Sequence, residues 1–397
     1  MTAPAGSLRV VLGLGSAQTL AWGSTYYLPA ILAIPMARDL GVPAGFVFAA
    51  FSAALMVAAV LGPFAGRRID VLGGRDVLAL SSLVFALGLA GLGLAQGPLT
   101  LFAAWLVIGL GMGMGLYEAA FSTLAGLYGQ QARGALTGIT LLAGFASTIC
   151  WPISALLDAE FGWRTTCLLW AGAHVLVGLP LNRLIIPQCV RPATADPEVG
   201  SGDPGGRAPP RAHSRRLMIL LATVFAVTWF VSTAMATHLP RLLQEAGAAP
   251  AAAVAAAALV GPAQVAGRLL EFGLLRRFHP LLSARLAAMA HPLGAVALMA
   301  FGGPVAMLFT ILHGAGNGIL TIAKGTLPLA IFGSAGYGFR QGLLMLPARF
   351  AQAGAPYLFA LLIERFGTAA LTLSAALGLL AFTALLLLPH TSRGDLQ

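Results

Sequence analysis

Apolar runs of about 20 residues recur along the whole chain, and each is long enough to cross a lipid bilayer. Hydrophobic residues make up 58% of the chain and charged residues only 9%. A soluble chain has an apolar share of roughly 45–50%. Lipid offers no hydrogen-bond partners to an open backbone, so every run must form a helix. The sequence therefore predicts a polytopic, all-α membrane protein.

Turn signals such as Gly41-Val42-Pro43 separate the runs, and we count twelve spans. The segment 188–216 is the one long polar stretch; rich in proline, glycine and arginine, it predicts a flexible cytoplasmic linker. It divides the chain into an N-terminal six-helix bundle over 1–187 and a C-terminal six-helix bundle over 217–397. The predicted spans are 10–35, 43–64, 77–96, 99–128, 135–157, 164–187, 217–240, 251–275, 283–302, 304–332, 342–363 and 368–389.

The two halves repeat one another. "YLPAIL" at 27–32 corresponds to "HLPRLL" at 238–243, and "GMGMGLYEAAFSTLAGLYG" in the fourth span corresponds to "GAGNGILTIAKGTLPLAIFG" in the tenth. Three such matches occur in the same order along the chain, "GRRID" and "GRLLE" being the third. They indicate two pseudo-symmetric copies of one six-helix unit.

The basic residues gather in alternate loops between the spans. This bias explains the net charge of +10 better than nucleic-acid binding does, and it predicts a multi-pass protein of the cell inner (plasma) membrane with both termini cytoplasmic. The first apolar run is too long for the core of a cleaved signal peptide. The three cysteines are scattered and suggest neither disulfides nor a zinc site.

The stretch "GRRIDVLGGRD" (66–76) gathers five charged residues directly after the second span. Gly66, Asp70, Gly73 and Arg75 fit the pattern G-x-x-x-D-x-x-G-x-R at this place. In this the chain resembles the major facilitator superfamily of secondary transporters. The resemblance implies two six-helix halves around a central cavity and solute transport by alternating access. Two features depart from the family: the frequent arginine early in span 4 is absent, and the second copy of the signature is degraded, with Glu271 roughly where Asp70 stands.

The resemblance also implies a gate formed by this loop. We expect Asp70 to lie near the start of span 11, around Gly342, where the positive end of the helix dipole stabilises a carboxylate. That contact would hold the two halves together on the cytoplasmic side in one state and break in the other. The alternative is a solvated loop that only sets orientation. The residues expected to take part in gating are Gly66, Asp70, Gly73, Arg75, Glu271 and Lys324.

Charged residues inside a membrane are expensive and mark a cavity or a partner. Spans 4, 8, 10 and 11 hold Glu118, Arg268, Glu271, Lys324 and Arg349. Arg349 lies seven residues beyond Gly342, roughly 10 Å into its span. Lys324 is placed nearer the surface, where a lysine side chain can snorkel to water. The resemblance puts all these spans beside the cavity.

Two interpretations of these charges remain open. In the first, Arg268 and Arg349 bind a substrate carboxylate through their guanidinium groups, and Glu118 exchanges a proton. In the second, the charges form salt bridges that close the cytoplasmic gate or hold helices together. Arg268 and "AWGSTYYLPAIL" (21–32) are loosely similar to features of the monocarboxylate-porter branch. Gln264 stands where that branch would carry a carboxylate.

Neutral polar residues can complete a pocket or merely join helices. Tyr26 and Tyr27 in span 1, and His313 and Asn317 in span 10, are the candidates for substrate contact. His313 and Asn317 are four residues apart and share a helix face. His174 and His291 fall on spans that are peripheral in this fold, so we expect them to be structural.

The expected function is proton-linked symport of a small organic solute, best a carboxylate or other organic anion. The expected partners are this substrate, protons and the lipid bilayer. We expect a monomer that binds no nucleic acid, metal or cofactor. Export of a toxic or drug-like compound is the alternative within transport. A receptor with this fold is a further one. A membrane enzyme is not expected, because the histidines are dispersed and neither H-E-x-x-H nor S-x-x-K occurs.

Overall fold

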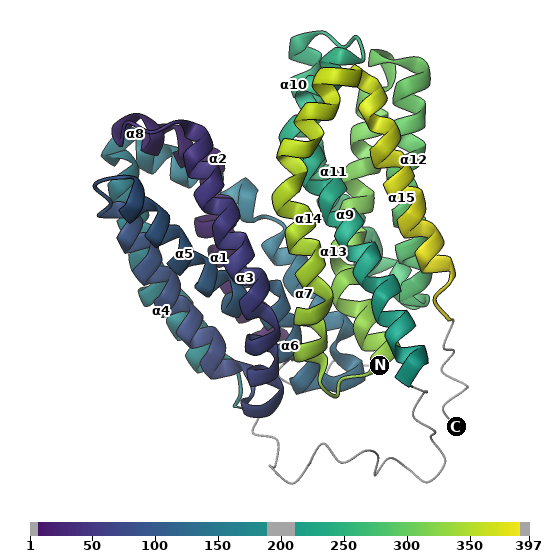
Figure 1. Ribbon diagram of the computed structural model, residues 1–397. Coiled ribbons are helices and arrows are strands. Elements are labelled where there is room, and N and C mark those ends of the chain that lie inside the picture. The colour runs from purple at the N-terminus through teal and green to yellow at the C-terminus, as the bar shows by residue number, and fades with distance from the viewer. Residues whose placement is uncertain (1–6, 189–210, 390–397) are drawn as a thin grey trace, which may run out of the picture. The chain divides into compact units, whose positions relative to one another are not determined.

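The computed structural model describes residues 7–188 and 211–389, and helices account for nearly all of them (Figure 1). Most of the predicted linker lies outside the described residues. Its last part, from residue 211 on, is helical rather than flexible because it begins the long helix α9. The α-helices are α1 (Ser7–Ala21), α2 (Pro29–Asp39), α3 (Ala44–Leu72), α4 (Gly74–Gly93), α5 (Pro98–Gly115), α6 (Tyr117–Tyr128), α7 (Arg133–Ala143), α8 (Ala146–Ala173), α9 (Arg211–Glu245), α10 (Pro250–Ala258), α11 (Val260–Gly273), α12 (Pro280–Phe301), α13 (Ala306–Phe332), α14 (Tyr337–Phe366) and α15 (Leu371–Leu386).

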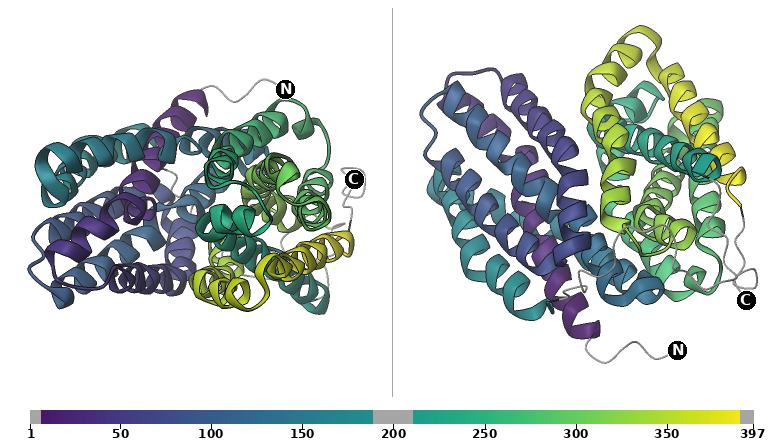
Figure 2. Two further views of the ribbon diagram at one scale, coloured as in Figure 1. Left: turned by 90° about the horizontal axis from the view of Figure 1, so that it is seen from above. Right: turned by 60° about the horizontal axis from the view of Figure 1, so that its bottom comes forward.

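The chain forms two compact units. The first comprises Met1–Cys189 together with Gly333–Leu346, and the second comprises Val190–Phe332 together with Pro347–Gln397. Within each unit the helices pack lengthwise against one another, as Figure 2 shows from two sides. The first part of α14 thus packs with the helices before the predicted linker, and the rest packs with those after it.

Eight helical stretches of the described chain are long and apolar enough to cross a membrane. Three of them join two or more α-helices: residues 98–185 contain several helices in succession, residues 250–273 contain α10 and α11, and residues 337–386 contain α14 and α15. Inside α8, Gly162 has a positive φ of 78°, so this element is two helices joined at a kink. The expected all-α membrane fold is confirmed, whereas the count of twelve spans stays a prediction.

Several spans predicted as continuous helices are interrupted. In the second unit, Leu259 separates α10 from α11 within span 8, and the other interruptions lie in the first unit. Span 1 passes from α1 through a π-helical turn, Trp22–Tyr26, before α2 begins at Pro29. Span 4 breaks at Leu116, whose backbone is extended (φ −85°, ψ −167°). The predicted fifth span is interrupted between α7 and α8. The side-chain amide of Gln18 donates to the carbonyl of Gly115 at 2.6 Å, so the break in span 4 leaves that group satisfied.

The segment predicted as the signature loop is mostly helical. Helix α3 continues to Leu72, with Gly66 and Ile69 buried and Arg67 and Arg68 exposed. Gly73, at φ 81°, is the single residue between the end of α3 and the start of α4. The amphipathic pattern of these residues extends the helix beyond the apolar span, which is why hydropathy alone placed its end too early.

Helix α14 also begins earlier than predicted, at Tyr337 rather than Gly342. A Cβ on Gly66 would collide with the Gly338 carbonyl, and one on Gly342 would lie 2.5 Å from backbone atoms of Pro63. Two G-x-x-x-G pairs, Gly62 with Gly66 and Gly338 with Gly342, therefore bring α3 and the start of α14 into backbone contact.

Candidate functional site

An aromatic cluster surrounds the broken helices of the first unit. The Trp22 ring lies 4.9 Å from the Tyr26 ring and 4.7 Å from the Tyr117 ring, measured between centroids. Tyr26 in turn lies 5.3 Å from Tyr27. The indole N–H of Trp151 donates to the Tyr27 carbonyl at 3.0 Å, so this side chain satisfies backbone exposed by the break in span 1.

The two predicted tyrosines, Tyr26 and Tyr27, therefore lie where span 1 is interrupted, and both are half-buried. Tyr117 brings the break in span 4 to the same place. Interrupted helices of this kind build the binding sites of many secondary transporters, because irregular backbone is tolerated in a membrane only where it lines a cavity or is buried in protein. Sequence patterns did not indicate the breaks.

Glu118 occupies the first turn of α6, directly after the break at Leu116, and is half-buried. It lies close enough to Tyr337 for an electrostatic interaction, and Tyr337 interacts in the same way with Asp70 and Arg340. Tyr337 is fully buried. The structure thus groups Glu118 with the residues predicted to form the gate.

Asp70 caps the N-terminus of α14 from outside that helix. Its Oδ1 accepts from the backbone N–H of Gly338 at 2.8 Å, and its Oδ2 accepts from that of Phe339 at 2.9 Å. The first N–H groups of a helix have no partner within it, and they carry the positive end of its dipole. The carboxylate lies at the start of this helix as predicted. The helix itself begins at Tyr337, five residues before the expected Gly342.

The other two signature positions shape the turn after α3. Gly73 supplies the positive φ between α3 and α4, which side chains rarely adopt. The guanidinium of Arg75 donates to the Gln188 side chain at 2.6 Å and lies 3.2 Å from the Asp76 carboxylate. Arg75 therefore links the start of α4 to Gln188, which follows the π-helical turn Leu181–Ile185.

The second unit contains every charged side chain that is buried in the described part of the chain. They are three cations and one carboxylate, with exposed fractions of 5% or less. Helices α11, α13 and α14 carry them. The four are Arg268, Glu271, Lys324 and Arg349.

Two of these cations share one aromatic ring. The Lys324 ammonium lies 3.9 Å from the centre of the Trp229 ring, and the Arg349 guanidinium carbon lies 5.3 Å from it. Arg349 also donates to the side chain of Gln352 at 3.0 Å. The electron-rich face of an indole attracts cations, most strongly where water is excluded. Trp229 therefore brings α9, α13 and α14 together around positive charge.

The structure gives the burial and the helix position of these two cations. Lys324 was expected to snorkel near a helix end, but it is 4% exposed and lies eight residues before the end of α13. Arg349 lies twelve residues into α14, roughly 18 Å, because that helix starts earlier than hydropathy indicates.

Arg268 is buried with unused donors. Its Nη2 lies 3.5 Å from the Gln264 side-chain oxygen, while its Nε and Nη1 have no hydrogen-bond partner. A buried guanidinium with two open donors is costly unless a ligand meets them.

Helix α11, which carries Arg268 and Glu271, packs closely against α13, which carries Lys324. A Cβ on Gly314 would meet the Val260 carbonyl at 2.8 Å, and one on Gly318 would collide with the Gln264 carbonyl, so α11 and α13 run side by side in the same direction. Three of the four buried charges therefore lie on this pair of helices, and the fourth, Arg349, lies on α14.

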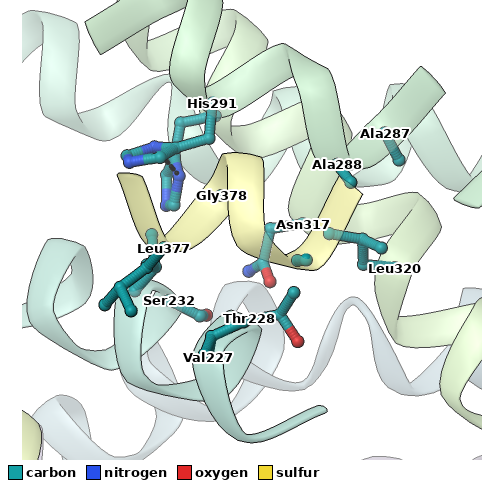
Figure 3. A pocket seen from close by; sticks show the side chains of 13 residues that line it. Val227, Thr228, Ser232, Ala287, Ala288, His291, Asn317, Leu320, Leu377 and Gly378 are labelled. Carbon is teal, nitrogen blue, oxygen red and sulfur yellow. Dashed lines mark hydrogen bonds between the residues drawn. The ribbon is translucent and has the colours of Figure 1, made fainter. Parts of the chain in front are cut away.

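His313 and Asn317 lie elsewhere in the second unit, and they face one cavity as their spacing predicts (Figure 3). The cavity has a volume of about 30 Å³, which holds water but not an organic solute. His291 lines it too and is hydrogen-bonded to His313. His291, expected to be structural, thus shares a site with a predicted substrate residue.

Sequence reasoning missed several residues of these sites. Gln341 and Gln352 are about 99% buried on α14. Gln352 stands inside the predicted span 342–363, where a glutamine in an apolar run was the signal that could have found it. Tyr337 lay outside the predicted span, in a stretch that reads as a turn. Within residues 7–188 and 211–389, no three histidine, cysteine, aspartate or glutamate side chains could hold a metal ion together.

Comparison with known proteins gives matches along most of the chain. Residues 14–311 match the family described as Major Facilitator Superfamily. Monocarboxylate transporter 3 of Rattus norvegicus is 26% identical over 351 residues, which cover 82% of this chain and 68% of that protein. An uncharacterized 38 kDa protein in the 23S RNA operon of Thermoproteus tenax is 34% identical over 170 residues. That match covers 42% of this chain and 44% of the relative, so it spans less than half of either protein.

Solved structures share the fold. The fucose:proton symporter FucP of E. coli superposes with a TM-score of 0.75 at 15% identity, covering 96% of this chain and 98% of that one. The proton:xylose symporter XylE gives a TM-score of 0.73 at 14% identity, covering 97% and 96%. The human organic anion transporter MFSD10 gives 0.66 at 19% identity, covering 96% and 100%. At these identities the likeness concerns the fold alone.

Proposed function

Because the chain belongs to the Major Facilitator Superfamily, we propose that this multi-pass membrane transporter carries a small organic anion, best a carboxylate, by alternating access. Transport is proton-linked, and the protein acts as a monomer in the inner membrane with both termini cytoplasmic. The family relationship supports a transporter rather than an enzyme. The preference for an anionic substrate follows from the charged side chains buried in the second unit.

The observation that carries the proposal is the excess of buried positive charge in the second unit. Three cations, Arg268, Lys324 and Arg349, are buried there against one carboxylate, Glu271, among the described residues. Each buried ion loses several kcal/mol of hydration energy, so an uncompensated excess is unfavourable. A bound carboxylate would reduce this excess from two charges to one.

Arg268 is the best candidate for direct contact with the carboxylate. Two of its nitrogens already point at no acceptor, so binding an anion requires no ion pair to break. A guanidinium matches a carboxylate with two parallel hydrogen bonds. Arg349 and Lys324, held against Trp229, would supply the surrounding positive potential.

The remaining roles belong to the first unit. Tyr26 and Tyr27 at the broken span 1 would contact the apolar part of the solute. Glu118 would exchange a proton. The Asp70 contact with Gly338 and Phe339 would break and re-form as the transporter changes state, aided by the close approach at Gly66 and the turn at Gly73 and Arg75. In the second unit, Glu271 and Lys324 would contribute to gating.

The test is uptake of radiolabelled L-lactate by purified protein in proteoliposomes, with and without an imposed inward proton gradient. We expect the gradient to stimulate uptake, and unlabelled lactate inside to drive counterflow. R268Q should lower both on the order of 100-fold. R241Q is the matched control, because Arg241 is half-exposed on α9 and its nearest carboxylate, Glu245, is 4.0 Å away.

Efflux of a drug-like compound is tested in the same vesicles with ethidium as the probe. Wild-type protein that moves ethidium but neither takes up nor exchanges lactate would refute the anion assignment. Equal loss of lactate uptake in R241Q and R268Q would show that the buried arginine has no special role.

A further inference from the structure

Two histidines form a buried pair in the second unit. Nδ1 of His291 on α12 lies 3.0 Å from Nδ1 of His313 on α13, and the ring planes meet at 70°. Their exposed fractions are 7% and 4%. A neutral imidazole has one N–H and one bare nitrogen, so one ring must donate to the other. The two rings therefore hold opposite tautomers.

The pair adjoins a small cavity with a mostly apolar lining. Nε2 of His291 is buried and has no hydrogen-bond partner. The cavity volume of about 30 Å³ is enough for about two water molecules. Asn317, Thr228 and Ser232 line the same cavity and offer oxygen atoms to such water (Figure 3).

The chemistry of this arrangement suits one added proton. If His291 donates its Nδ1–H to His313, its Nε2 is a bare, basic nitrogen. A proton there converts the neutral pair into an imidazolium that donates to an imidazole, and this charge-assisted bond is about twice as strong as a neutral one. A second proton would place two positive charges on adjoining rings, which is unfavourable.

Among the residues that the structure describes, no charged side chain lines the cavity beside the pair. Among the thirteen residues that line the cavity, the two histidines are the titratable ones. Helix α15 carries no charged residue between Leu371 and Leu386. The other described charged or titratable groups on the surrounding helices lie further off. On α12 and α13 they lie at least six residues from His291 or His313, and on α9 at least six residues from Ser232, which lines the cavity; α11 contributes no residue to the cavity. These groups are Arg285 on α12, Lys324 on α13, Arg215, Arg216, His238, Arg241 and Glu245 on α9, and Arg268 and Glu271 on α11.

We propose that the His291–His313 pair is a proton-binding site that takes up one proton, shared between the two rings and solvated by water in the adjoining cavity. Burial favours the neutral pair while the cavity is dry, and water entering it favours the charged pair. The site would therefore gain and lose its proton as the second unit changes its hydration. Its part in transport rests on the proposed function; its ability to bind a proton does not.

The direct test is nitrogen-15 NMR of histidine-labelled wild-type protein in lipid bilayers, titrated from about pH 8 to about pH 5. We expect coupling between the two Nδ1 atoms at the alkaline end and a single imidazolium per pair at the acidic end. H313Q and H291Q assign the signals among the seven histidines. A pair that stays neutral throughout, or that takes up two protons, would overturn the proposal.

Transport gives the second test. Stimulation of L-lactate uptake by an inward proton gradient should disappear in H291Q and persist in H238Q. His238 is a suitable control because its ring donates to the backbone carbonyl of Pro356 at 2.8 Å and does not belong to the pair. Stimulation that persists in folded H291Q would remove the pair from coupling. Should wild-type protein fail to transport lactate, the proposed function fails, and the NMR titration still decides whether the pair binds a proton.

Discussion

Replacing Asp70 should loosen the first part of α14 from α3. The carboxylate accepts two backbone hydrogen bonds, at 2.8 and 2.9 Å, from N–H groups that have no partner in their own helix. D70A removes both acceptors and the charge at the helix dipole. Each hydrogen bond to a charged group contributes about 1.5–3 kcal/mol, so a total of about 3 kcal/mol is a conservative figure. D70N keeps one acceptor and should cost about 1 kcal/mol.

Hydrogen–deuterium exchange measures this change locally. A peptide covering 333–346 should exchange on the order of 100-fold faster in D70A and about fivefold faster in D70N, since every 1.4 kcal/mol is a factor of ten. D76N is the matched control. Asp76 pairs with Arg183 on the surface, and both side chains are at least half exposed. Such a pair contributes at most about 1 kcal/mol.

The reasoning would be refuted by unchanged exchange in D70A, because the carboxylate would then not hold the helix terminus. An equal acceleration in D76N would refute it too, since the effect would belong to loop charge in general. Exchange that rises over the whole first unit would indicate global destabilisation, and peptides from α4 and α5 distinguish this case.

Three other substitutions test the packing and the charged site. G66A should lower stability by about 1–3 kcal/mol in a thermal unfolding assay, because its Cβ would collide with the backbone of Gly338, whereas G126A, with open space around its Cβ, should not lower it. W229F should raise the KM for lactate about fivefold, because phenylalanine binds cations about 1 kcal/mol more weakly; an unchanged KM would exclude the ring from the site. R268Q should lower lactate uptake on the order of 100-fold through two lost hydrogen bonds, yet cost little stability, since the buried charge it removes has open donors. A large drop in melting temperature would instead indicate a structural arginine.

Hydropathy and charge placement were sufficient for much of the architecture. An apolar run must become a helix in lipid whatever its neighbours are, so the membrane fold could be predicted without tertiary information. The scarcity of charge in those runs likewise singled out Arg268, Glu271, Lys324 and Arg349, and the structure buries all four. The position of Asp70 at a helix terminus followed from elementary electrostatics and the family resemblance.

Only the tertiary structure decided how these residues are grouped. The breaks at Trp22–Tyr26 and Leu116 depend on partners such as Gln18, which lies 97 positions from the carbonyl that it satisfies. The pairing of His291 with His313 depends on how α12 and α13 pack, which periodicity within one helix does not encode. Hydropathy reports the free energy of moving each residue from water into lipid. It carries no information about which side chains will be in contact across a helix interface. The sites of this protein consist of such contacts.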